Sequence, residues 1–128
     1  MTYLFELWID GNEVEHINTA LGMTSENKLL ETVFPDQYWG ATSPRDFDFS
    51  SNEELAKKAI VDYLESATSH KRNPFYLSSS KTRNDARIAS LTDMQNIAND
   101  FAREFKRIYE IGMLSQRTGK EVRVRIST

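Results

Sequence analysis

The sequence predicts a single α+β domain over residues 1–128, with a mainly antiparallel sheet and two helices packed on one face of it. Short segments rich in β-branched and aromatic residues lie beside turn signals, which favours antiparallel pairing of strands. Two longer segments repeat apolar residues at helical spacing. A chain of 128 residues with 39% hydrophobic and 27% charged residues is typical of one globular domain.

The N-terminal segment predicts a β-hairpin. Residues Tyr3–Ile9 are rich in aromatic and β-favouring side chains, and Asp10-Gly11 follows them directly. Asp-Gly tolerates the positive φ angles that a tight hairpin turn requires. We therefore expect the segment Glu13–Ile17 to be the returning strand.

The next segment contains two less regular parts. Lys28–Phe34 is compatible with a helix or a strand, and we expect a strand because the residue before Pro35 avoids the helical region. Pro35–Phe49 contains two prolines, one glycine and no helical period, which predicts a long loop.

Two helices are expected in the rest of the chain. The first begins at Ser50 or Ser51, because each serine precedes a glutamate by three residues as in a capping box, and it ends near residues 66–69. The second spans Thr92–Ile111 and ends near Gly112, a C-terminal cap. Its apolar stripe consists of Met94, Ile97, Ala98, Phe101, Ala102, Phe105, Ile108 and Tyr109.

Two further β elements are predicted around the second helix. Phe75–Leu77 and Ala86–Ser90 form an expected hairpin whose exposed connection is residues 78–85. Val122–Ile126 alternates apolar and basic residues, the pattern of a half-buried strand.

Composition excludes several classes of protein. The chain has no cysteine, which excludes disulfide scaffolds, thiolate metal sites and cysteine nucleophiles. No run of 18 apolar residues occurs, and residues 1–6 lack the basic and apolar regions of a signal peptide. We expect a cytoplasmic protein without a membrane segment.

The formal net charge of −3 conceals an asymmetry along the chain. Residues 1–69 carry 13 acidic and 4 basic side chains, whereas residues 70–128 carry 12 basic and 6 acidic ones. Such a split indicates a partner of defined charge or a bipolar surface. Alternatively, the two halves interleave in the fold and their charges neutralise each other.

No motif carries a convincing catalytic or metal site. The two histidines, His16 and His70, lie far apart in the sequence, and one imidazole alone cannot hold a metal. Asp46–Asn52 resembles the opening of a calcium loop but lacks its glycine and its final glutamate. Ser78–Lys81 matches S-x-x-K outside the helical context that gives this motif a mechanism. No cofactor is expected.

The segment from Phe34 to Phe49 is the most suggestive of binding. Tyrosine and tryptophan commonly anchor protein interfaces, and neighbouring aspartates steer a basic partner. Alternatively, the aromatic side chains fold back as a lid on the core. The candidate partner-binding residues are Asp36, Tyr38, Trp39, Asp46, Phe47 and Asp48.

These observations favour a non-catalytic binding protein with a basic protein partner, such as an immunity protein (antitoxin) that masks the active site of a nuclease-type toxin. This hypothesis is an analogy of size and charge. A nucleic-acid-associated protein that uses its basic second half is the alternative, and a small enzyme with an unrecognised site is a third. The basic residues concerned are Lys71, Arg72, Lys81, Arg83, Arg87, Arg123 and Arg125.

Overall fold

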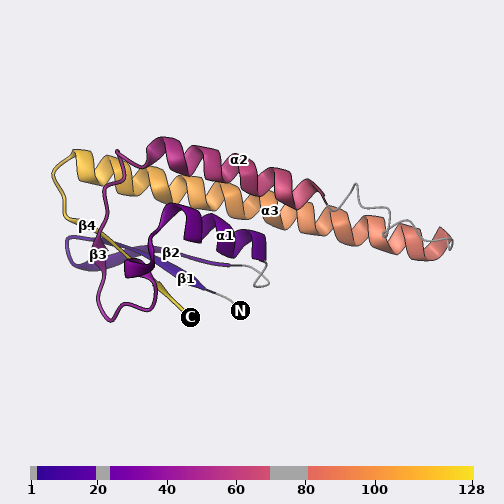
Figure 1. The fold of residues 1–128 in the computed structure, drawn as a ribbon, viewed down its shortest axis with the longest axis horizontal. Helices are drawn as coiled ribbons and strands as arrows, with labels where there is room; N and C mark the ends of the chain where they lie inside the picture. Colours follow the sequence, from indigo (N-terminus) through magenta and orange to yellow (C-terminus); the bar gives the residue numbers. More distant parts are fainter. Residues whose placement is uncertain (1–2, 20–23, 70–80) are drawn as a thin grey trace.

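The computed structural model describes residues 3–19, 24–69 and 81–128, with side chains for 3–19, 25–66 and 95–128. Within these residues it contains a four-stranded antiparallel sheet and three α-helices, which confirms the predicted α+β class and adds one helix to the two expected (Figure 1). The elements in chain order are β1 (Leu4–Ile9), β2 (Asn12–Asn18), α1 (Thr24–Val33), the short 3-10 helix η2 (Asp36–Tyr38), β3 (Arg45–Asp46), α2 (Glu53–Ser69), α3 (Lys81–Arg117) and β4 (Val122–Ser127).

The sheet has the strand order β2-β1-β4-β3, and the helices lie on one side of it (Figure 1). Alternation along β1 and β4 explains this arrangement. Phe5 and Leu7 of β1 are buried, as are Val122, Val124 and Ile126 of β4, and the residues between them point to the opposite face.

The predicted N-terminal hairpin is confirmed. β1 and β2 pair in antiparallel register, and the turn residues Asp10 and Gly11 have φ angles of 51° and 81°. These positive values match a turn whose twist suits the flanking strands. A register shift between Leu7 and Trp8 introduces a bulge into the hairpin.

The prediction of a strand at Lys28–Phe34 is wrong, because residues 28–33 belong to α1. Proline restricts the residue that precedes it, but α1 ends at Val33 and leaves only Phe34 in that position. Leu29, Leu30 and Val33 share the buried face of the helix at the spacing of one turn.

The strand expected at Ala86–Ser90 is also wrong. These residues lie within α3, a helix of 37 residues that includes the predicted segment Thr92–Ile111. No glycine or proline interrupts the chain between Lys81 and Ile111, so extending the helix meets no breaking residue. The other part of that expected hairpin, residues 75–80, lies outside the described residues.

The helix α3 ends five residues beyond the predicted stop at Gly112. Gly119, with φ of 88°, is the residue that caps it. The Lys120 N–H donates to the Ser115 carbonyl at 3.1 Å, and the Gly119 N–H donates to the Gln116 carbonyl at 3.1 Å. This pair of bonds is the Schellman motif, which satisfies the last carbonyls of a helix.

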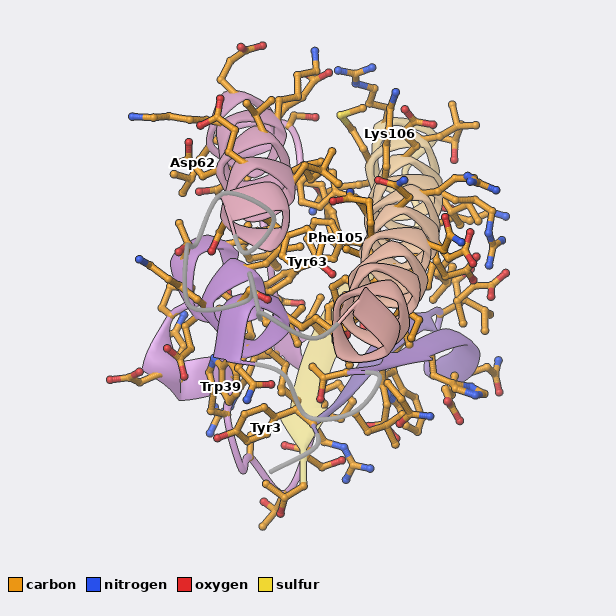
Figure 2. The ribbon with its side chains drawn as sticks, turned by 90° about the vertical axis from the view of Figure 1, so that its right-hand side faces the viewer. Tyr3, Trp39, Asp62, Tyr63, Phe105 and Lys106 are labelled. Atoms are coloured by element: carbon orange, nitrogen blue, oxygen red, sulfur yellow. The ribbon has the colours of Figure 1, made fainter. Side chains whose placement is uncertain are left out.

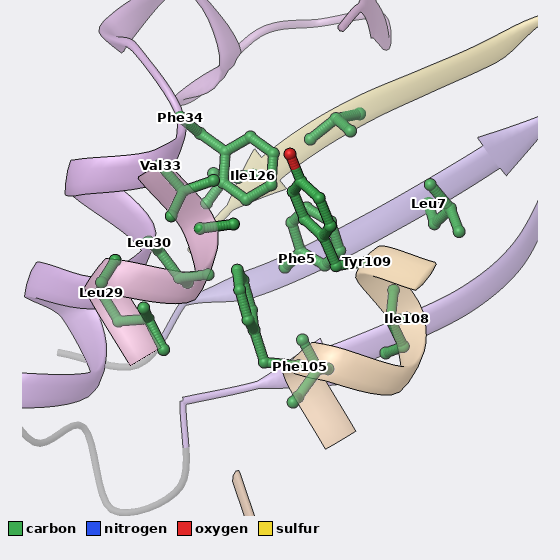
Figure 3. Packing of buried hydrophobic residues seen from close by; sticks show 14 of the residues in the cluster. Phe5, Leu7, Leu29, Leu30, Val33, Phe34, Phe105, Ile108, Tyr109 and Ile126 are labelled. Carbon is green, nitrogen blue, oxygen red and sulfur yellow. The ribbon is translucent and has the colours of Figure 1, made fainter. Parts of the chain in front are cut away.

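The core is an aromatic cluster enclosed by the sheet and the three helices (Figure 3). The ring of Phe34 lies 4.9 Å from that of Phe5 and 4.8 Å from that of Phe47, measured between centroids. Phe105 and Ile108 bring α3 into the same cluster. Residues distant in the sequence are thus joined in one core, in keeping with a single domain.

The helix α2 begins differently from the predicted capping box. Asp48 accepts hydrogen bonds from the N–H of Ser51 at 3.2 Å and from its hydroxyl at 2.6 Å. These bonds lower the pKa of Asp48 and hold a carboxylate near the positive end of α2. Of the helices in the described ranges, none has the length and apolar character needed to cross a membrane.

Candidate binding surface along the edge of the sheet

The loop that carries the candidate residues runs along the free side of β4. Trp39 forms an isolated parallel bridge with Ile126, and Asp46 pairs with Arg123 in the β3–β4 register. Three residues of a strand span about 10 Å, so Trp39 and Asp46 lie along the same edge of the sheet. We call residues 36–48 the edge loop.

Two of the predicted contact residues are part of the core. Tyr38 and Phe47 are each only 4% exposed. The Tyr38 hydroxyl donates to the Asp46 carbonyl at 2.5 Å, and the ring of Phe47 lies 4.9 Å from that of Phe49. The expectation that Tyr38 and Phe47 contact a partner is therefore corrected. Both side chains form a lid on the core, so their rings are not available to a partner.

Trp39 remains partly exposed and is held in a fixed orientation. Its ring meets Tyr3 edge to face with centroids 4.6 Å apart, and its Nε1–H donates to the Phe34 carbonyl at 3.1 Å. Figure 2 shows Tyr3 and Trp39 close together, away from the two long helices. A partly exposed tryptophan fixed in this way loses little rotamer freedom when it contacts a partner.

The three aspartates of the edge loop are exposed but differ in their partners. Asp46 pairs with the Arg123 guanidinium at 3.1 Å, and Asp48 is engaged by Ser51 at the start of α2. Asp36 has no ion pair within the described part of the chain. It is therefore the aspartate of this loop whose charge is most available to a partner.

Sequence reasoning missed Gln116, which ties the edge loop to α3. Its side-chain oxygen accepts the Phe49 N–H at 2.9 Å, and its side-chain nitrogen donates to the Phe47 carbonyl at 2.8 Å. Near these bonds is an open hollow of about 600 Å³, lined in part by Asp46, Asp48 and Lys120. A glutamine in the last turn of a helix gives no local signal for such a role, because its partners lie 67 and 69 residues away.

The fold pairs basic residues of the second half with acids of the first. Such pairing neutralises part of the charge asymmetry between the two halves. It also leaves fewer arginines free to contact the phosphates of a nucleic acid. Hydrogen bonds to Glu104 first and to Glu15 second raise the pKa of Arg107, and the hydrogen bond to Glu6 raises the pKa of Arg125, since each carboxylate stabilises the charged guanidinium. The pairs are Arg107 with Glu15, Arg117 with Glu53, Arg123 with Asp46, and Arg125 with Glu6.

The parts of the chain outside residues 67–94 carry a clear acidic excess. They contain 17 acidic and 11 basic side chains, because five of the basic residues fall within 67–94. The backbone of Lys81, Arg83 and Arg87 belongs to the part of α3 that extends beyond α2 in Figure 1. This part of the α3 backbone lies away from the sheet and its edge loop.

The described residues contain no group of three or more His, Asp or Glu side chains that could hold a metal. His16 Nδ1 lies 3.3 Å from a Glu13 carboxylate oxygen at the exposed surface. His70 and the serines of the S-x-x-K sequence lie outside the described residues.

Comparison with known proteins adds no assignment, since no protein-family model, curated protein or solved structure matches this chain. The residues of the edge loop and their contacts are thus the basis for a functional interpretation.

Proposed function

We propose that this chain is a non-catalytic cytoplasmic binding protein for a basic protein partner. The proposed class is that of an immunity protein, which covers the cationic active site of a nuclease-type toxin. In this proposal the contact is made by the exposed part of the edge loop, with Trp39 as the anchor and Asp36 as the charge that orients the partner.

The observation that carries the proposal is the environment of Trp39. Contact with Tyr3 and the hydrogen bond to the Phe34 carbonyl fix the indole, yet part of the ring stays accessible. Tryptophan is among the residues that contribute most to binding energy in protein interfaces. A preorganised tryptophan beside an unpaired aspartate suits a protein surface better than it suits a phosphate backbone.

Charge supports the same class of partner. Outside residues 67–94 the chain carries six more acidic than basic side chains. An acidic surface raises the association rate with a cationic partner and repels nucleic acid. Arg123 and Arg125, two of the basic residues considered for nucleic-acid binding, are already paired with carboxylates, as are Arg107 and Arg117.

The proposal is tested by capturing partners at low salt with the full tagged chain from lysate of its source cells. A captured basic protein is then purified, and its association and dissociation rates with each variant are measured. Asp36→Lys should slow association and weaken its salt dependence, because a peripheral charge acts through steering. Trp39→Ala should speed dissociation, with a loss on the order of 2 kcal/mol, or about 30-fold in Kd.

Trp8→Ala is the matched control, because Trp8 lies in β1 among the residues that point away from the helices, and β4 separates β1 from the edge loop. It should leave both rates unchanged. Each variant is checked for folding by circular dichroism before binding is measured. A partner that binds Asp36→Lys and Trp39→Ala as tightly as the unchanged chain would contradict the proposal. Capture of nucleic acid that nuclease treatment removes would favour the alternative function.

A further inference from the structure

The free edge of β2 is a second exposed feature of the molecule. Within the described residues β2 is the outermost strand of the sheet and pairs only with β1. The Thr19 N–H, one residue past the end of β2, donates to the Tyr3 carbonyl on the β1 side. Backbone groups alternate in direction along an antiparallel strand, so the N–H and C=O of Asn18 and of His16 point outward.

These outward groups have no hydrogen-bond partner in the part of the chain that the structure describes. Proteins commonly block such an edge with lysine, proline or a bulge. β2 contains neither lysine nor proline, and its bulge, in which Val14 is the extra residue, lies beyond Glu15. The outward N–H and C=O groups of His16 and Asn18 are therefore open to an added strand.

Acidic side chains flank this edge on both faces of the sheet. Glu15 is on the helix side, where Arg107 contacts both it and Glu104 of α3. Glu13 is on the opposite face, and among the described residues its ion pair is with His16, at 3.3 Å. In β2 and the ion pairs attached to it, three carboxylates thus meet one guanidinium and one histidine. The edge carries a net negative charge when His16 is neutral.

We propose that the free edge of β2 binds an extended segment of a protein, rich in lysine or arginine, which joins the sheet as an added strand. Main-chain hydrogen bonds to His16 and Asn18 hold the segment. Its alternate basic side chains approach Glu13 on the face of the sheet away from the helices. This inference does not rest on the proposed function, because the edge loop lies at the other edge of the sheet.

Charge favours a basic segment over a second copy of this chain. β2 contains Glu13 and Glu15 but no lysine or arginine. Pairing β2 with another β2 therefore brings carboxylates together, and like charges on facing strands are destabilising. A basic strand instead forms cross-strand pairs of opposite charge, which stabilise a sheet. The exposed side chain of Val14 adds apolar area next to the edge.

The probe is a short blocked peptide of alternating lysine and threonine, titrated into the full isotope-labelled chain and followed by NMR. A short added strand buries little area, so we expect a Kd on the order of 100 µM. The largest chemical-shift changes should fall on the amides of His16 and Asn18. These two amides should also exchange with solvent more slowly in the complex, because they become hydrogen-bonded. A peptide of alternating glutamate and threonine should not bind.

Two pairs of variants separate the backbone contact from the charge. Asn18→Pro removes an outward N–H and should weaken binding of the lysine peptide about tenfold, whereas Asn18→Ala keeps that N–H and should bind as before. Glu13→Lys reverses the charge beside the edge and should weaken binding about fivefold, whereas Glu31→Lys on α1 should have no effect. Circular dichroism establishes that each variant is folded. The NMR map of the unchanged chain tests the site even where a substitution unfolds the protein.

Absence of binding at about 1 mM lysine peptide overturns the proposal. So do equal binding of the two peptides, shift changes that lie away from β2, and unchanged binding by folded Asn18→Pro. Protection of the His16 and Asn18 amides that appears with rising protein concentration alone would assign the edge to a second copy and equally overturn it. Trp39→Ala should bind the peptide like the unchanged chain, so failure here is distinguishable from failure of the proposed function.

Discussion

Replacing Gly112 with alanine tests how closely α3 packs against the loop before α2. Gly112 lies inside the helix, where alanine is intrinsically preferred by about 1 kcal/mol. A Cβ atom at this position would, however, lie 2.7 Å from Cε1 of Phe49 and 2.8 Å from its Cζ. The substitution therefore sets a favourable helix propensity against a steric overlap.

The overlap should dominate because Phe49 cannot move aside. Its ring is fully buried between Phe47 and Tyr109, with centroids 4.9 Å and 5.1 Å away. Its backbone is held on both sides, since its N–H donates to Gln116 and its carbonyl accepts the Tyr109 hydroxyl. Overpacking of a core costs about 1–3 kcal/mol, and because this ring is fixed we take the upper half of that range, about 2–3 kcal/mol. After the helix gain of about 1 kcal/mol we expect a net loss of about 1–2 kcal/mol.

Urea unfolding followed by circular dichroism measures this loss. With a slope of about 1.5 kcal/mol/M, the midpoint should fall by about 1 M. The cavity variant Phe49→Leu should separate the two effects, because in that background Gly112→Ala gains the helix propensity without meeting the ring. There the second substitution should be neutral or stabilising.

Gly119→Ala is the comparison at a glycine with a different role. A Cβ atom added at Gly119 would meet open space, but the backbone there has φ of 88°. The expected loss of about 1 kcal/mol therefore comes from backbone strain. This loss should not depend on Phe49. A Gly112→Ala variant as stable as the unchanged chain, or one whose loss persists in the Phe49→Leu background, would refute the packing argument.

Three further outcomes are expected. Phe101→Ala should cost about 3–5 kcal/mol in urea unfolding, because Phe101 is 4% exposed in the core; a loss under about 1 kcal/mol would contradict that placement. Tyr109→Phe should cost about 1–2 kcal/mol, because it leaves the buried Phe49 carbonyl without its donor. Tyr63→Phe should be close to neutral, since within the described residues the Tyr63 hydroxyl has no hydrogen-bond partner. Equal losses for the two variants would contradict this difference in hydrogen bonding. Burial raises the pKa of both tyrosines above the usual value of 10.0, so the folded state favours the protonated hydroxyls. Stability from this source is complete below about pH 10 and is lost as the pH rises further, and the Tyr63→Phe/Tyr109→Phe double variant should show a smaller alkaline loss in thermal melts from about pH 8 to 11.

The sequence by itself determined the elements whose signals are local. Asp10-Gly11 specifies the first turn because few residue pairs tolerate two positive φ angles in succession. The alternation in β4 and the helical spacing between Ala98 and Tyr109 each identify a buried face from neighbouring residues alone. These elements are enough to establish the α+β class.

Other local signals were ambiguous. The segment of α1 has apolar residues that suit a strand or a helix, and contact with α2 favours the helix. The residues before Thr92 continue α3, which no glycine or proline interrupts there, although the sequence alone indicated a turn and a strand. Short segments commonly take the conformation that their tertiary surroundings require.

The candidate surface depended most on tertiary structure. In the edge loop, which is largely irregular, no periodicity distinguishes a buried ring from an exposed one, so Tyr38 and Phe47 could not be told from Trp39. The pairing of Arg107 with Glu15 and of Arg125 with Glu6 joins residues 92 and 119 positions apart. The sequence shows that charges of both signs are present, but only the folded chain decides which of them meet, because Coulomb interactions depend on distance in space and not on separation along the chain.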